Sequence, residues 1–250
     1  MTDANPSEPA DDGAGSPIIR HTERERSFEF AAGDSENIEA ISEHIGKHIG
    51  AVKSVFHELV SDLVHIDIHM VAPSTARPFH TLVTSGMSDR AMTVAEGCDD
   101  PTFAELMLCL PPSWPLEHGN FKEERNYWPL RALKMLARMP HEYATWLAPG
   151  HTVPNGNPPK PFAENVGFTC ALIARPLTTS DEFYDLPTTS GKIIHFYSVV
   201  PLYAEEMTLK LESGMEALFP GFDKHGVTEI VDIARPNIAA PAKPWWRKVF

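Results

Sequence analysis

The chain has 250 residues, of which 42% are hydrophobic, enough apolar material for one large domain or two small ones. Its formal net charge of −13 disfavours a nucleic-acid-binding protein, because such proteins present a basic face to phosphates. No run of 18 apolar residues occurs, so we expect no transmembrane helix, and the acidic N-terminus does not resemble a signal peptide.

The three cysteines, Cys98, Cys109 and Cys170, are an odd number and lie far apart in the sequence. Cys109 and Cys170 stand in apolar runs, where cysteine behaves as a small hydrophobic residue. No CxxC pair or disulfide framework is present, so we expect a reducing compartment and a cytoplasmic protein without a cofactor.

Both ends of the chain are predicted to be tails. Residues 1–34 are rich in Asp, Glu, Ser, Gly and Pro, a composition that buries too little apolar surface to offset the entropy of the chain, and we expect disorder there. Residues 234–250 are rich in proline and end in aromatic and basic residues, and we expect Trp245, Trp246 and Phe250 to pack on the domain rather than on a membrane. The domain between them, residues 35–233, carries a net charge of −12.

The first half of the domain predicts one helix and three strands. Asp34 or Ser35 can cap a helix that reaches about Ile49 and places four isoleucines on one stripe. In residues 62–71, apolar and polar side chains alternate with a period of two, which predicts a half-buried strand. Strands at 79–85 and 103–110 follow after short loops, so the three strands predict an antiparallel meander.

The second half predicts helices and strands in alternation. A helix is expected over 126–138, and Pro140 ends it or starts a second helical turn. Residues 148–162 are too rich in proline for a regular element and predict a loop. Central strands are expected at 168–174 and 193–200, a closing helix at 203–218, and a short apolar run at 227–233.

One polar cluster could bind a metal ion. His65, Asp67 and His69 share one face of the predicted strand, and imidazole with carboxylate suits zinc or another divalent ion. Further ligands are available at Asp62, His80 and His195. Alternatively, the cluster is the polar side of a strand that faces water or pairs across the sheet. Because strand alternation explains the pattern, we expect no bound transition metal.

A hydrolase is a weaker alternative. His57 and Glu58 precede Ser61, but no G-x-S-x-G nucleophile elbow occurs, and the segment 85–89 has the residues of a turn. No glycine-rich phosphate-binding motif is present. The sequence therefore indicates a non-enzymatic protein, with a metal-assisted hydrolase centred on His65, Asp67 and His69 as the enzymatic alternative.

Four segments together resemble the suppressor of fused domain: FHTLVTSGMSD, AELMLCLPPSWP, NYWPLRALKMLARMPHEYATWLAPGHTVP and IIHFYSVVPLYAEEMTLKLESGMEALF. Their order and spacing are similar to that family over roughly residues 35–233, and the uninterrupted domain resembles the stand-alone bacterial members. The resemblance implies an α/β (α+β) fold, a single domain with a central mixed, largely antiparallel sheet flanked by helices. It brings no catalytic residues.

The resemblance also implies function by binding. Animal members hold a transcription factor by gripping an extended peptide as an added strand, and bacterial members have been proposed to act as immunity proteins. An immunity-type protein that neutralises a toxin domain is the function we expect, since an acidic body suits a basic toxin. The alternative is a regulator that binds a peptide by β-strand addition.

We expect the partner to bind near the loop from 146 to 159, which is too long for a simple connection. Trp146, His151 and Asn155 offer an aromatic anchor and polar contacts of the kind found at interface hot spots. The resemblance points the same way, because the corresponding stretch borders the peptide groove in animal members. Alternatively, Trp146 is a core residue and the loop a rigid surface element. The turn residues Ser85, Met87 and Asp89 form the next candidate site.

Overall fold

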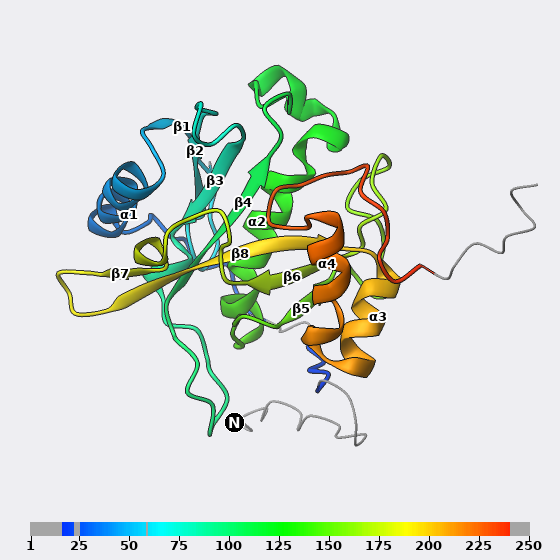
Figure 1. Ribbon diagram of the computed structural model, residues 1–250. Helices are drawn as coiled ribbons and strands as arrows, with labels where there is room; N and C mark the ends of the chain where they lie inside the picture. The colour runs from blue at the N-terminus through cyan, green and yellow to red at the C-terminus, as the bar shows by residue number, and fades with distance from the viewer. Residues whose placement is uncertain (1–16, 23–25, 59, 241–250) are drawn as a thin grey trace, which may run out of the picture.

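The computed structural model describes residues 17–22, 26–58 and 60–240 (Figure 1). The expected packing of Trp245, Trp246 and Phe250 lies outside these residues. Within the described ranges, each helix is too short or too polar to cross a membrane.

The described strands form one eight-stranded mixed sheet in the order β1-β2-β3-β4-β8-β6-β5, with β7 paired to β8 off this path (Figure 1). The strands are β1 (Val52–Phe56), β2 (Asp67–Val71), β3 (His80–Ser85), β4 (Ala104–Leu110), β5 (Thr152–Pro154), β6 (Cys170–Ala174), β7 (Asp185–Pro187) and β8 (Ile193–Leu202). Every described pair is antiparallel except β4 with β8, which confirms the expected mixed, largely antiparallel sheet.

Helices cover both faces of the sheet. They are α1 (Ser35–His48), α2 (Glu124–Tyr143), α3 (Ala204–Ser213) and α4 (Phe219–His225). Alternate residues of β4 separate the two faces: Leu106 and Leu108 belong to the core under α2, whereas Met107 and Cys109 belong to the core under α1. A third cluster joins β6 and the end of β8 to Leu218 and the neighbouring helices α3 and α4. The arrangement is the α/β class with helices on both faces of a central sheet.

The first predicted helix and the strands at 79–85 and 103–110 are confirmed by α1, β3 and β4. Asp34 caps α1, since its side chain accepts hydrogen bonds from the amides of Glu36 and Asn37. The prediction of a half-buried strand is wrong, because every residue of β2 is buried and helices lie above and below the sheet. The strand β1 was not expected, since its sequence VKSVF has no regular alternation.

Three predictions in the second half are corrected. The helix α2 continues through Pro140 to Tyr143 instead of breaking there. Part of the expected loop 148–162 forms the strand β5, which pairs with β6. The expected helix 203–218 ends at Ser213, because Gly214 adopts a φ of +84° that terminates it, and a further helix, α4, follows.

The expected domain boundaries at 34 and 234 stay a prediction, although residues outside them make contacts with the domain. The backbone of Glu29 and Ala31 hydrogen-bonds to residues 61–63, and Arg26 pairs with Asp62 at 2.8 Å. At the other end, Arg235 is buried and forms two 2.6 Å hydrogen bonds to the buried carboxylate of Glu206.

A second buried carboxyl group, that of Glu105 in β4, fixes the turn after β3. Its oxygens accept hydrogen bonds from the Thr84 hydroxyl at 2.6 Å, the Ser88 amide at 2.9 Å and the Ser88 hydroxyl at 2.7 Å. Burial raises the pKa of Glu105 to about 7, although these hydrogen bonds by themselves lower it.

Replacement of Glu105 by Gln is expected to flatten the pH dependence of stability. The pKa of Glu105 is about 7 in the folded chain and 4.5 when exposed, so unfolding releases a proton between these values. The free energy of unfolding therefore falls as pH rises through this window, by at most about 3 kcal/mol. Urea denaturation of both proteins at several pH values measures the difference, and identical pH dependences would contradict the prediction.

Replacement of Arg235 by Ala is expected to destabilise the fold by about 3 kcal/mol, because it leaves the Glu206 carboxylate buried without its partner. The matched control is Arg125→Ala, whose arginine side chain is 52% exposed and pairs with surface glutamates. We expect the control to change stability by less than about 1 kcal/mol. Thermal or urea unfolding tests both, and equal losses would refute the structural role of Arg235.

Candidate functional site

The predicted loop places Trp146 and His151 side by side. Trp146 follows the end of α2, where Ala144 takes the left-handed conformation with φ of +49° and turns the chain. His151 directly precedes β5, and the two rings meet edge to face with centroids 5.3 Å apart. The indole Nε1 donates a 2.7 Å hydrogen bond to the Asp100 carboxylate, which lies in the loop before β4. Both rings are half-buried.

Residues in or beside β6, β7 and β8 extend this cluster. The guanidinium of Arg175, after β6, lies 3.9 Å from the centre of the Tyr184 ring. Tyr184 in turn contacts His195 of β8, with ring centroids 5.6 Å apart. His195 Nδ1 pairs with the carboxylate of Asp185 at 2.7 Å. We call the set the aromatic surface; its members are Asp100, Trp146, His151, Arg175, Tyr184 and His195.

Asp100, which binds Trp146, also acts through its charge on Tyr184, so the Trp146 and Tyr184 parts of the aromatic surface lie close together. Burial raises the pKa of Tyr184, opposed by the Arg175 charge and assisted by the negative charges of Asp185 and Asp100. Burial lowers the pKa of His151, so this ring is neutral near pH 7. The aromatic surface therefore presents aromatic rings, including the neutral ring of His151, between the exposed Arg175 and several carboxylates.

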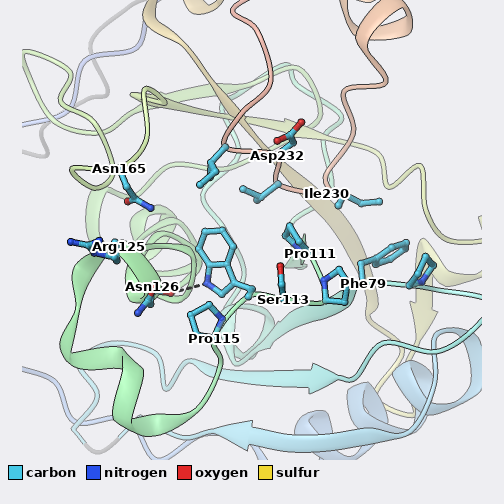
Figure 2. Close-up of a pocket in the computed structure, with 14 residues that line it drawn as sticks. Phe79, Pro111, Ser113, Pro115, Arg125, Asn126, Asn165, Ile230 and Asp232 are labelled. Carbon is cyan, nitrogen blue, oxygen red and sulfur yellow. Dashed lines mark hydrogen bonds between the residues drawn. The ribbon is translucent and has the colours of Figure 1, made fainter.

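The opposite end of β4 borders a groove of about 540 Å³ (Figure 2). Trp114 lines the groove, and its Nε1 donates a 3.0 Å hydrogen bond to the Asn126 carbonyl. Phe79 and Ile230 form an apolar side, and Arg125 and Asp232 lie on the rim. The groove can hold an apolar side chain of a partner, and it contains none of the residues that the sequence predicts for binding.

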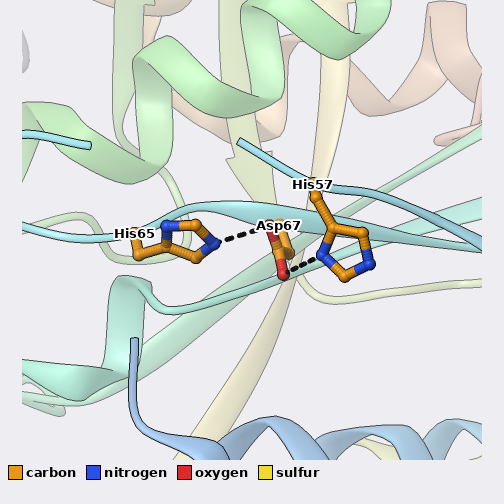
Figure 3. Close-up of side chains that lie close together, drawn as sticks. All are labelled: His57, His65 and Asp67. Carbon is orange, nitrogen blue, oxygen red and sulfur yellow. Dashed lines mark hydrogen bonds and ion pairs between the residues drawn. The ribbon is translucent and has the colours of Figure 1, made fainter. Parts of the chain in front are cut away.

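The group of possible metal ligands in the structure differs from the predicted one by one residue. His69 is buried and hydrogen-bonds to Ser85 at 3.0 Å, so it does not join His65 and Asp67. His57 takes its place: its Nδ1 lies 2.8 Å from Asp67 Oδ2, and His65 Nε2 lies 3.0 Å from Asp67 Oδ1 (Figure 3). His69 is thus not among the ligand atoms that converge on Asp67, and the expectation that no transition metal is bound stays a prediction.

The three other proposed ligands lie elsewhere. Asp62 pairs with Arg26, His80 contacts the Pro112 carbonyl, and His195 pairs with Asp185. Each of them has its own partner away from His57, His65 and Asp67, the group whose possible ligand atoms all lie within 4.8 Å of one another.

The sequence of the chain matches the model of the suppressor of fused protein family over residues 62–236. The chain belongs to the suppressor of fused family. Its fold is similar to a suppressor of fused homologue from Neisseria gonorrhoeae, with a TM-score of 0.57, 20% identity and coverage of 83% of this chain and 98% of that one. It is also similar to a Sufu protein crystallised in a Sufu–Fu complex, with a TM-score of 0.58, 15% identity and coverage of 81% and 92%. No curated protein matches the sequence.

The match to the suppressor of fused family covers some candidate residues and not others. The whole aromatic surface lies within residues 62–236, as do His65 and Asp67. His57 lies outside this range, together with α1 and β1. The identities to the solved structures are low, so those structures support the fold and not a particular site.

The remaining predicted binding residues are buried or form hydrogen bonds within the domain. Ser85 and Met87 are fully buried and offer no side-chain surface to a partner in this structure. Asp89 accepts hydrogen bonds from the Asn37 side chain and the Asp34 amide, which attaches the start of α1. The Asn155 side-chain amide donates to the carbonyls of Lys160 and Pro161 and closes its own loop. Their role in binding stays a prediction.

The sequence analysis did not point to Asp100, Arg175 or Tyr184, and it named His195 only as an available metal ligand. None of them belongs to a recognisable motif, and each is separated from Trp146 by many residues. Asp100 and Arg175 lie just outside predicted strands and His195 lies near the start of one, whereas Tyr184 precedes β7, a strand that was not predicted. Only the pairing of β4 with β8 shows that these ends meet.

Proposed function

We propose that this chain is a protein-binding module that acts by surface complementarity and not by catalysis, with the aromatic surface as its binding site. The observation that carries the proposal is that Trp146, Arg175 and Tyr184, from three separate segments, form one cluster around Asp100 and His195. Tryptophan, tyrosine and arginine are the residue types that dominate binding energy at protein interfaces.

The fold supports the proposal. In eukaryotes the suppressor of fused fold is a protein-interaction module, and one similar structure is a complex of Sufu with Fu. The half-buried rings of the aromatic surface are also held in place before binding, through the Trp146–Asp100 hydrogen bond and the Arg175–Tyr184 contact. Held side chains lose little conformational entropy when a partner binds, which favours affinity.

The charge of the domain supports a basic partner. Residues 35–233 carry a net charge of −12; Glu96 and Asp99 are exposed in the loop before β4, and Asp185 is exposed at the start of β7. A toxin domain that acts on nucleic acid carries a basic face for phosphates. An immunity-type protein could neutralise it by covering that face, and the opposite charges would also speed their encounter. Neutralisation of such a toxin in the cytoplasm is the function we propose.

A second binding function is favoured by one observation, the open edge of the sheet. Within the described residues β1 pairs with β2 alone, so its other edge has no strand beside it. A peptide of a regulatory partner could add to β1 as a further strand. Hydrogen exchange of the complex separates the two functions, because strand addition protects the amides of residues 52–56 and binding at the aromatic surface does not.

The partner is to be identified first, by using the full chain as bait in cells that produce it. We expect a partner with net positive charge that is captured by the wild-type chain and lost from Arg175→Ala. Once that partner is purified, calorimetry gives its affinity for each variant. A captured partner that is acidic would contradict the proposed toxin class.

Replacement of Arg175 by Ala is expected to weaken partner binding by at least about 1 kcal/mol while leaving stability nearly unchanged, because the side chain is exposed. Arg125→Ala is the matched control, an exposed arginine at the groove on the other end of β4. Loss of affinity in the control alone would place the partner in the groove and refute the proposed site.

Association with the partner is expected to slow as salt is added. Screening limits the reach of the domain's negative charge to about 8 Å at physiological ionic strength. Stopped-flow measurements at low and high salt test this. A rate that does not depend on salt would refute electrostatic steering, and with it the argument for a basic partner.

A further inference from the structure

The side chains of His57 and His65, both in the segment between β1 and β2, converge on Asp67, the first residue of β2 (Figure 3). Asp67 is the centre: its two carboxylate oxygens face the two imidazoles at 2.8 and 3.0 Å. The Asp67 side chain is 3% exposed, that of His65 is 18% exposed, and that of His57 is 67% exposed. The cluster is therefore anchored in the domain and open to solvent on the His57 side.

The hydrogen bonds of the Ser61 hydroxyl determine which ring nitrogen of His65 carries a proton. The buried Ser61 hydroxyl has one hydrogen, and it lies 2.8 Å from Glu58 Oε2 and 2.7 Å from His65 Nδ1. The Glu58 carboxylate accepts two 2.7 Å contacts from Arg138, and as a carboxylate it has no proton to give. Ser61 therefore donates to Glu58, and His65 Nδ1–H donates to Ser61.

With Nδ1 as the donor to Ser61, Nε2 of His65 faces Asp67 Oδ1 at a distance of 3.0 Å. Either a proton on Nε2 or a metal cation between these two atoms makes the contact favourable. Asp67 Oδ1 already accepts the Glu58 amide at 3.0 Å. Hydrogen bonding of the far ring nitrogen is also how histidine ligands of metals are oriented.

We propose that His57, His65 and Asp67 bind one zinc ion, with a fourth position open to water. Two imidazole nitrogens and one carboxylate oxygen are ligands that zinc accepts, at about 2.0–2.2 Å from the ion, which places ligand atoms about 3.3 Å apart in a tetrahedral site. The ligand atoms here lie within 4.8 Å of one another, so small rotations of the side chains reach that geometry. The exposed His57 is the ligand with most freedom to move.

The surroundings stabilise this ligand set. Ser61 fixes the orientation of His65, and the Glu58 amide fixes Asp67. The backbone of His65 is held by the turn at Gly86, where a Cβ atom would lie 1.8 Å from the His65 carbonyl oxygen. Nearby positive charge is balanced, because Arg138 pairs with Glu58, and the charge of Lys134 interacts with both Glu58 and Asp67. This proposal departs from the sequence-based expectation of no transition metal, which rested on His65, Asp67 and His69.

The test is calorimetric titration of the full-length, metal-free chain with zinc chloride. We expect one binding site per chain. The variant His57→Ala is expected to lose at least about 10-fold in affinity, since a ligand is removed. His57 is mostly exposed, so this variant folds as the wild type does, which near-ultraviolet circular dichroism verifies. His225→Ala, an exposed histidine at the end of α4, is the matched control and should bind zinc as the wild type does.

Two further variants test the geometry. Asp67→Asn should reduce the affinity as His57→Ala does, and Ser61→Ala should lower it about 10-fold because the orientation of His65 is lost. Cobalt in place of zinc should give the visible spectrum of a tetrahedral site in the wild type and lose it in His57→Ala. Absence of saturable zinc binding, or equal affinity in the wild type and His57→Ala, would overturn the proposal and leave a proton on His65 Nε2 as the solution to the contact.

The zinc site does not depend on the proposed protein-binding function. The partner experiments use Arg175 and Arg125, and the zinc experiments use His57, His225, Asp67 and Ser61. Failure of one set therefore leaves the other unaffected.

Discussion

The parallel pairing of β4 with β8 is the constraint on which the rest of the structure depends. These strands are far apart in the sequence, and they are the only parallel pair in the described sheet. The pairing joins the antiparallel half β1–β4 to the antiparallel half β8–β6–β5. Parallel strands need a long connection between them, and here that connection includes α2, which covers one face of both halves. Without this pair the chain would have two small sheets, each with an unprotected edge.

The same pairing creates the aromatic surface. Ala104 at the start of β4 lies opposite His195 near the start of β8, and the amide of His195 donates to the Phe103 carbonyl at 3.0 Å. The loop before β4, with Asp100, is thereby placed beside the β7–β8 hairpin, with Tyr184. The end of α2 adds Trp146 to the same place. A binding surface assembled from so many segments is rigid only when the sheet beneath it is complete, which ties the proposed function directly to the fold.

A second chain of contacts links β4 to the histidine cluster. The Glu105 carboxyl group of β4 holds Ser88, and with it the turn that begins at Gly86. Gly86, at a φ of +102°, is the residue type that allows this turn to approach the backbone of His65. His65 precedes β2, and its backbone lies against the turn after β3, which Glu105 of β4 holds in place. The buried carboxyl of Glu105 therefore contributes to the geometry of the proposed zinc site.

The sequence by itself determined the elements with strong local signals: the capped helix α1, the apolar strands β3, β4, β6 and β8, and the similarity to the suppressor of fused family, from which the fold class followed. It also identified Trp146 and His151 as neighbours, because they are close in the chain. Its errors came from tertiary context. The alternation around His65 predicted one wet face, whereas helices above and below the sheet bury all of β2, and His69 with it. The partners of Trp146 and the replacement of His69 by His57 were decided only by strand pairing between distant segments. Such pairing leaves no trace in local periodicity, because side-chain alternation specifies which face a residue occupies and not which strand lies next to it.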